Sequence, residues 1–145
     1  MHSVGVLHAI ADERIMGENG GAMLKTATLI AFAATTDGAK ARQFYEGVLG
    51  LRVISDDAFA LALDANGTML RIQKVGDLSP PPFTTLGWEV SDISATVDAL
   101  RKSNVAFETY PGMDQDERGI WRAPSGARVA WFKDPDGNTL SLTQM

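Results

Sequence analysis

The chain carries the same short hairpin signal twice. Residues 64–72 and 134–142 match position by position: each begins with an aspartate, has a glycine at its fourth position and continues into apolar residues. An Asp/Asn-Gly turn between apolar runs is the strongest short-range signal for a β-hairpin. Upstream of each copy, Asp37 or Asp92 opens a segment with helical spacing. The chain is therefore predicted to contain two copies of one unit, and any pocket should lie where the copies meet.

The expected order of elements in each copy is strand, helix and three strands. We place the first unit at residues 26–75 and the second at 84–145, and the linker, 76–83, contains three prolines that exclude a central strand. In the first unit we expect strands at 26–34, 51–54, 58–63 and 68–74 and a helix from Asp37 to Gly50. In the second we expect strands at 84–90, 106–110, 127–133 and 139–144 and a helix at 93–102. The second unit is the longer one, mostly because of residues 111–126.

The first 22 residues have no counterpart in the repeat. Their one apolar run, 4–11, is too short for a membrane span and lacks the basic start of a signal peptide. Glycines at 17, 20 and 21 separate this stretch from the duplicated part of the chain. We therefore expect residues 1–22 to be a dispensable appendage and residues 23–145 to form a single domain.

Composition excludes several functions. The 145 residues include no cysteine, so a thiolate metal site and a thiol nucleophile are both ruled out. The net charge of -5 comes without any basic run, which argues against a nucleic-acid surface. With no membrane span expected, we predict a cytoplasmic protein that uses neither a membrane nor a nucleic acid as partner.

Three short motifs inside the duplicated unit resemble those of a known family. They are Phe44-Tyr45, the Leu-Gly-Leu at 49–51 and the Asp-Pro-Asp-Gly-Asn at 134–138. Together with the repeat, they resemble the vicinal oxygen chelate superfamily, which includes glyoxalase I, bleomycin-resistance proteins, fosfomycin-resistance enzymes, extradiol dioxygenases and methylmalonyl-CoA epimerase. The resemblance covers residues 26–145 and implies an α+β fold in which two tandem βαβββ units form a cupped, half-barrel mixed sheet. We expect Phe44 and Tyr45 to pack in the core and the 134–138 turn to be structural.

The positions that hold a metal in other family members carry unsuitable residues here. The family places its ligands, usually His, Gln or Glu, on the first and last strands of each unit. By the spacing from the capping and turn aspartates, these positions correspond to Ile30, Arg71, Thr85 and Ser141. Such side chains do not supply the lone pairs that a divalent ion needs. The only histidines, at 2 and 8, lie in the appendage, so we predict no metal and no cofactor.

Strand alternation predicts which other side chains share the cup with those four positions. The set is Phe32, Ala34, Met69, Gln73, Gly87, Glu89, Thr139 and Thr143, and aligning the two hairpins adds Leu61 and Trp131. An apolar, aromatic concavity with a few polar groups is typical of a small-molecule site. A cup simply filled by its own side chains is the alternative. The ligand-binding candidates are Phe32, Met69, Arg71, Gln73, Thr85, Trp121, Trp131 and Ser141.

Arg71 and Glu89 are the two charged residues expected on the cup face. Because a buried charge is costly unless paired, they should either pair with each other or meet a ligand, unless they reach solvent at the strand ends. A free Arg71 would bind an anionic oxygen, and a desolvated Glu89 could act as a general base. The loop around Trp121 is either a lid over the cup or a solvated hairpin.

Three functions remain open at this point. The first is a metal-free binding protein that sequesters a small molecule, similar to bleomycin-resistance proteins. The second is an enzyme, either a glyoxalase-like lyase or isomerase or a metal-independent acid/base catalyst using Glu89 and Arg71. The third is a structural partner with a closed cup. In each case we expect a homodimer, because the sheets leave open edges, with 51–54 and 106–110 as the favoured ones.

Overall fold

The computed structural model describes residues 23–145, of which Ala31–Met145 form one compact unit. The described residues before this unit contain a 3₁₀ turn, η1 (Met23–Thr26). The expectations for residues 1–22, including their dispensability and the role of the two histidines, lie outside the described residues. Along residues 23–145, no helix is long and apolar enough to cross a membrane.

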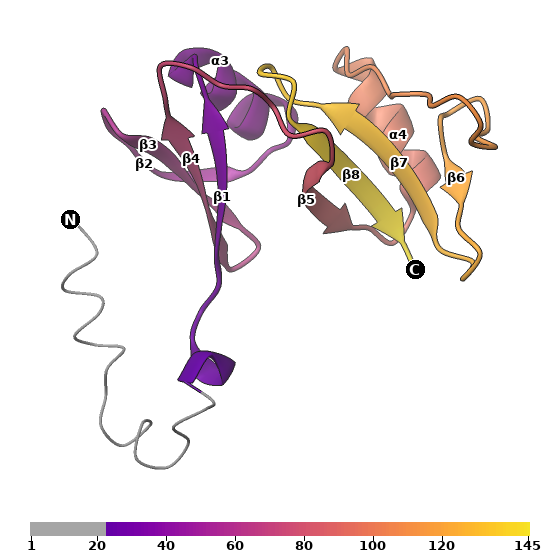
Figure 1. The fold of residues 1–145 in the computed structure, drawn as a ribbon, viewed down its shortest axis with the longest axis horizontal. Helices are drawn as coiled ribbons and strands as arrows, with labels where there is room; N and C mark the ends of the chain where they lie inside the picture. Colours follow the sequence, from indigo (N-terminus) through magenta and orange to yellow (C-terminus); the bar gives the residue numbers. More distant parts are fainter. Residues whose placement is uncertain (1–22) are drawn as a thin grey trace. The chain divides into compact units, whose positions relative to one another are not determined.

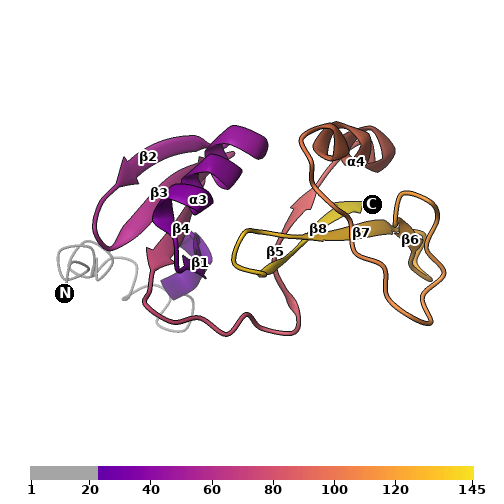
Figure 2. The same cartoon turned by 90° about the horizontal axis from the view of Figure 1, so that it is seen from above.

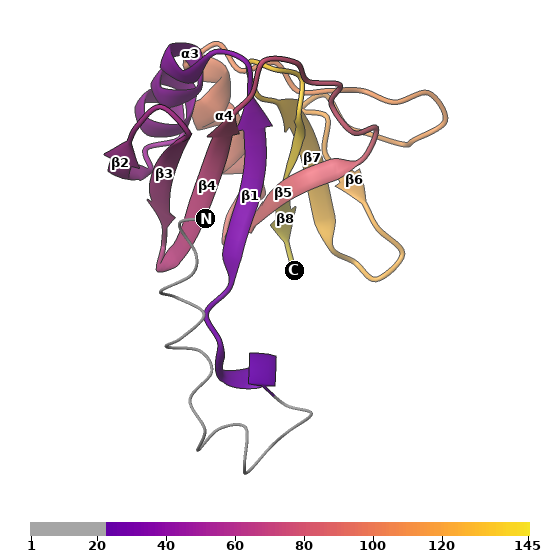
Figure 3. The ribbon, with the colours of Figure 1, turned by 60° about the vertical axis from the view of Figure 1, so that its left-hand side comes forward.

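The predicted duplication is confirmed: the chain forms two four-stranded sheets, each from one copy of the repeat (Figure 1). The first sheet has the order β1-β4-β3-β2, with β1 (Ile30–Thr35), β2 (Arg52–Asp56), β3 (Ala60–Ala65) and β4 (Thr68–Lys74). The second has the order β5-β8-β7-β6, with β5 (Thr84–Glu89), β6 (Trp121–Arg122), β7 (Arg128–Lys133) and β8 (Thr139–Gln144). In the second sheet β5 runs parallel to β8 and the other pairs are antiparallel, which gives a mixed sheet in an α+β fold. Figure 3 shows β1 beside β4.

Each sheet carries a helix against one face (Figure 2). Helix α3 (Gly38–Arg42) begins after Asp37, whose carboxylate accepts a hydrogen bond from the Lys40 N–H, as predicted for a cap. It continues as a π-helical segment, η2 (Gln43–Val48), rather than as the single α-helix expected. There the Leu49 N–H donates to the carbonyl of Phe44, five residues back. Helix α4 (Ile93–Lys102) has the predicted bounds and the predicted cap, Asp92.

The two hairpins differ in register by one residue. The first is a two-residue turn in which Asn66 and Gly67 both have positive φ, 51° and 95°, as a type I′ turn requires. The second leaves five residues, 134–138, between its last paired residues. As a result Arg71 pairs with Ala62 in the first sheet, whereas Ser141 pairs with Trp131 in the second.

Between these two matching pairs the second hairpin is one residue longer than the first. This extra residue overturns the expected placement of Leu61 in the cup, which assumed that the first strands of the two hairpins align without a shift. With the shift, Ala62 is the counterpart of Trp131, and the side chain of Leu61 lies on the opposite, fully buried face of the sheet.

The strand expected at 106–110 is also wrong. Only Phe107 makes an isolated bridge, to Phe132, and the edge of the sheet is continued by β6 within the expected loop. Side chains of the loop hold it together: the Gln115 amide accepts from the Tyr110 N–H and donates to the carbonyls of Glu108 and Gly119. The insertion is therefore an ordered lobe that replaces a regular edge strand.

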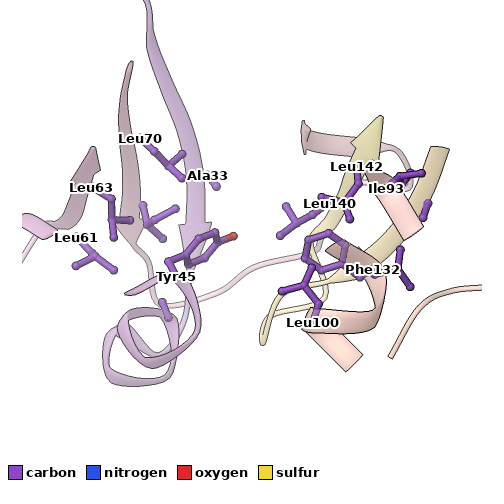
Figure 4. Close-up of a cluster of buried hydrophobic side chains, with 14 of the residues drawn as sticks. Ala33, Tyr45, Leu61, Leu63, Leu70, Ile93, Leu100, Phe132, Leu140 and Leu142 are labelled. Atoms are coloured by element: carbon purple, nitrogen blue, oxygen red, sulfur yellow. The ribbon is translucent and has the colours of Figure 1, made fainter. Parts of the chain in front are cut away.

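Apolar side chains on the helix-covered faces form the core (Figure 4). Tyr45 and Phe132 are fully buried, and Phe44 packs edge-on against Tyr45 with a ring separation of 5.1 Å. Phe44 also contacts Phe132 from the second repeat, at 6.4 Å. The prediction that Phe44 and Tyr45 belong to the core is confirmed.

The buried carboxylate of Asp134 links the two repeats. Its Oδ2 accepts a hydrogen bond from the Tyr45 hydroxyl at 2.7 Å and another from the Asn138 amide at 2.8 Å. Its Oδ1 accepts from the N–H groups of Asp136 and Asn138 within its own turn. The Asn138 amide also donates to the carbonyl of Ala34. The turn is structural, as expected, but its side chains form hydrogen bonds with groups of the first repeat as well as with its own backbone.

A second carboxylate of the same turn reinforces this link. Asp136 accepts hydrogen bonds from the hydroxyl of Thr35 and from the N–H and hydroxyl of Thr36, the last two at 2.8 and 2.7 Å. Partial burial alone would raise the pKa of Asp136, but these donors hold the pKa below its ordinary value. The ionised form of Asp136 is therefore the one that fits between the repeats.

We expect Tyr45→Phe to destabilise the fold by about 1.5–3 kcal/mol, because the variant removes a hydrogen bond to a buried carboxylate. Burial, together with the charge of Asp134, raises the pKa of Tyr45 well above its ordinary value. The stability that this group contributes is therefore complete below about pH 10 and declines as the pH rises further, because the unfolded phenol ionises first. Denaturant unfolding at increasing pH should show this alkaline decline in the wild type and less of it in Tyr45→Phe. Tyr110→Phe is the comparison: partial burial, and to a smaller extent the charge of Glu108, also raise the pKa of Tyr110, but its hydroxyl has no buried carboxylate partner, so this variant should remove less of the decline. An unchanged alkaline slope in Tyr45→Phe would contradict the prediction.

Candidate functional site

One face of the first sheet is covered by no helix among residues 23–145, and it carries all four predicted ligand-binding residues of the first repeat. In β4, Leu70 and Ile72 are buried against the helical side, so alternation places Met69, Arg71 and Gln73 on the other face. In β1, Ala33 faces the core and Phe32 points the other way, with 50% of its surface exposed. The structure therefore brings together the four residues predicted from this repeat on an open, partly apolar surface.

Arg71 is half-buried on this surface and has no acidic side chain within 4.0 Å along residues 23–145. An ion pair with Glu89, one of the alternatives left open by the sequence, is thus not formed within the described part of the chain. The charge of Arg71 is felt at a distance: the pKa of Asp57 is lowered mainly by the N–H groups of Phe59 and Ala60, and to a smaller extent by Arg71. A half-buried guanidinium without a close carboxylate has unused hydrogen-bonding capacity.

The corresponding face of the second sheet is aromatic. Trp131 pairs with Ser141, and Trp121 on β6 places its ring 6.1 Å from that of Trp131, so three predicted ligand contacts come together. Tyr110 joins them edge-on, 5.6 Å from Trp131. Sequence reasoning missed Tyr110 because it assigned the residue to a regular strand. Its aromatic side chain beside the insertion was the available signal.

Two hydroxyl groups, those of Thr85 and Ser141, lie at the second-repeat positions that the sequence comparison predicts to correspond to the family's metal ligands. Thr84 pairs with Thr139 and Leu86 with Leu140, so the intervening Thr85 is an extra residue at a bulge. Its Oγ1 is buried and has no hydrogen-bond partner in the described structure. An orphaned buried hydroxyl of this kind calls for a water or ligand partner, or marks a functional position.

Gly87 makes room for the other hydroxyl. It pairs with Ser141, and a Cβ at position 87 would lie 2.6 Å from the Ser141 Oγ. Any larger residue at 87 would displace that hydroxyl. The equivalent position in the first repeat, counted from the capping aspartates, is Phe32.

The side chains at the family's metal positions do not fit a metal ion. Ile30, Arg71, Thr85 and Ser141 provide no imidazole or carboxylate, and Arg71 adds a positive charge. Across residues 23–145, no group of three or more His, Cys, Asp or Glu side chains is arranged to hold a metal.

Glu89, the candidate general base, lies at the end of β5 opposite Thr143 and is exposed. The desolvation on which that role depended is not met in the single chain. Its catalytic assignment stays a prediction.

Comparison with known proteins identifies the family. Residues 28–142 match the model of the Glyoxalase/Bleomycin resistance protein/Dioxygenase superfamily. No curated protein is similar enough in sequence to count as a match. Among solved structures, a bleomycin resistance determinant encoded on transposon Tn5 is 21% identical, with a TM-score of 0.65, and the alignment covers 82% of this chain and 98% of that one.

Two further structures agree in fold. Lactoylglutathione lyase from Agrobacterium tumefaciens is 18% identical with a TM-score of 0.61, covering 82% of this chain and 93% of that one. A glyoxalase/bleomycin resistance protein/dioxygenase from Alicyclobacillus acidocaldarius is 16% identical with a TM-score of 0.62, covering 82% and 91%. At these identities the likeness establishes the fold alone.

We expect Thr85→Val to raise the free energy of unfolding by about 1 kcal/mol, because the isosteric change removes a buried hydroxyl that has no partner. Thermal unfolding should show a rise of a few degrees, on the order of 2–8 °C per kcal/mol. Thr85→Ser, which keeps the hydroxyl, and Thr84→Val, at an exposed position, serve as controls. A loss of stability in Thr85→Val would mean that the hydroxyl is satisfied and structural.

Proposed function

Because the chain belongs to the Glyoxalase/Bleomycin resistance protein/Dioxygenase superfamily, we propose that it binds a small anionic molecule at Arg71 and sequesters it without a metal ion. The observation that carries this proposal is the half-buried guanidinium of Arg71, which has no carboxylate within 4.0 Å in the described part of the chain. The bleomycin resistance determinant with the same fold supports a binding role.

The chemistry of the surface favours a ligand with one anionic end and an apolar body. A guanidinium holds a carboxylate or phosphate through two parallel hydrogen bonds, and these are stronger than neutral ones. Phe32 and Met69, on the same face, provide apolar contact area beside the charge. The hydroxyls of Thr85 and Ser141 and the rings of Trp121 and Trp131 are the proposed contacts from the second repeat.

The alternative is an enzyme, either a glyoxalase-like lyase or isomerase or a metal-independent acid/base catalyst with Glu89 as base and Arg71 as oxyanion partner. The lactoylglutathione lyase of the same fold favours it. Prolonged incubation with a tightly bound ligand separates the two functions. Sequestration leaves the ligand unchanged by mass spectrometry, whereas catalysis yields a product.

We expect Arg71→Ala to weaken an anionic ligand by about ten- to a hundred-fold, since about 1.5–3 kcal/mol is lost per charge-assisted hydrogen bond. A thermal-shift screen of aromatic carboxylates, acyl-CoA esters and glutathione adducts would supply the ligand, and calorimetric titration would give its affinity. Arg71→Lys tests the forked geometry, and Arg52→Ala, at an exposed surface position, controls for loss of charge alone. Metal analysis of Arg71→Ala should still find no bound ion. Unchanged affinity for every ligand found would make Arg71 structural.

We further propose that the protein is a homodimer. The end strands of the two sheets are β1, β2, β5 and β6, so the edge expected at 51–54 is present as β2, whereas the one expected at 106–110 is replaced by β6. Ile54 on β2 and Phe32 on β1 are both substantially exposed, and apolar edges of this kind need a partner or a cover. Sedimentation velocity at micromolar concentration should show a dimer, and a monomer would refute the proposal.

A further inference from the structure

We propose a second binding site, on the helix-covered side of the sheets, for a small hydrophobic amine. A cavity of about 210 Å³ opens there between residues of both repeats. Its apolar wall consists of Leu49, Leu51, Trp88, Leu100, Phe132 and Leu142. Leu49 and Leu51 follow η2, and the other four come from β5, α4, β7 and β8. Figure 4 shows Leu100, Phe132 and Leu142 gathered beside α4.

This cavity is separate from the proposed anion site. In the second sheet Trp88 pairs with Leu142, and the adjacent Gly87 pairs with Ser141. Because side chains alternate along a strand, Trp88 and Leu142 point to the opposite face from Ser141. A ligand in this cavity therefore does not compete for the predicted ligand contacts of the anion site. Glu89, at the exposed end of the edge strand β5, is the one residue predicted for the cup that also lines the cavity.

The wall favours an apolar occupant over water. The hydroxyl of Thr96 also lines the cavity, but it already donates to the carbonyl of Asp92 at 2.9 Å. A buried water needs two to four polar partners, and the leucine and aromatic side chains provide none. The cavity is half open to solvent, and its volume of about 210 Å³ has room for one ring with a short substituent that leads to the opening.

The charge around the opening favours a cation. An adjoining shallow groove shares Glu89, Val90 and Thr96 with the cavity and adds Asp92. No basic side chain lines either feature, and Glu89 has no basic side chain within 4.0 Å in residues 23–145. Two carboxylates beside an apolar cavity attract an ammonium group and repel a carboxylate.

Three probes with the same ring and chain length test this inference: 2-phenylethylamine, 2-phenylethanol and phenylacetate. Calorimetric titration should rank the amine about three- to ten-fold tighter than the alcohol, with phenylacetate the weakest. In NMR titrations the indole N–H signal of Trp88, assigned with Trp88→Phe, should shift, whereas those of Trp121 and Trp131 should not. Glu89→Gln should bring the amine to within about two-fold of the alcohol.

A volume-filling variant locates the site. Thr96→Leu extends a larger side chain into the cavity and should weaken both the amine and the alcohol by at least about ten-fold. Thr96→Val removes the same hydroxyl without adding volume and should bind nearly as the wild type does. Should Thr96→Leu lower the melting temperature, Leu51→Phe fills the space from the opposite wall. Arg71→Ala should leave amine binding unchanged.

Several results would overturn the proposal. One is the absence of a Trp88 shift at saturating amine. Another is phenylacetate binding as tightly as the amine, and a third is full amine affinity in both volume-filling variants. None of these outcomes bears on Arg71, so the proposed anion site stands or falls separately.

Discussion

The fold depends on one buried carboxylate. Asp134 is almost fully buried, and an unpaired charge in such a place would cost several kcal/mol. The cost is offset because each oxygen accepts two hydrogen bonds, from the Tyr45 hydroxyl, the Asn138 amide and two N–H groups of its own turn. Since Tyr45 comes from the first repeat, the second turn and the π-helical segment of the first repeat stabilise each other. Tyr45 lies in this π-helical segment, where its side chain is fully buried and its hydroxyl reaches the carboxylate.

Local signals in the sequence predicted most of the architecture, and long-range contacts account for what was missed. Capping by Asp37 and Asp92 and the Asn66-Gly67 turn act over a few residues, so they can be recognised without the fold. The length of the second hairpin loop cannot be recognised in this way, because its five residues are held by contacts with the first repeat. Leu61 was misplaced because the second hairpin is one residue longer than the first between matching pairs.

In the candidate site, too, local signals predicted some residues and long-range contacts determine the others. Alternation placed Arg71 and its neighbours on β4 correctly, because a regular strand has a fixed period. The contact between Trp121 and Trp131 could not be placed by strand alternation, since it depends on how the insertion folds back. Tyr110 was missed for the same reason: Gln115 holds the main chain at Tyr110, and that contact has no signature in the local sequence.

The two repeats share one backbone fold but carry different side chains at matching positions of their sheets. On the uncovered face, the first sheet places large Phe32 and Arg71 beside small Ala62, whereas the second has Gly87 and Ser141 beside large Trp131 at the matching positions. Two copies with equal side chains would suit a symmetric occupant such as a metal ion held by like ligands from each half. Here one repeat supplies a cation and the other supplies aromatic rings and hydroxyls.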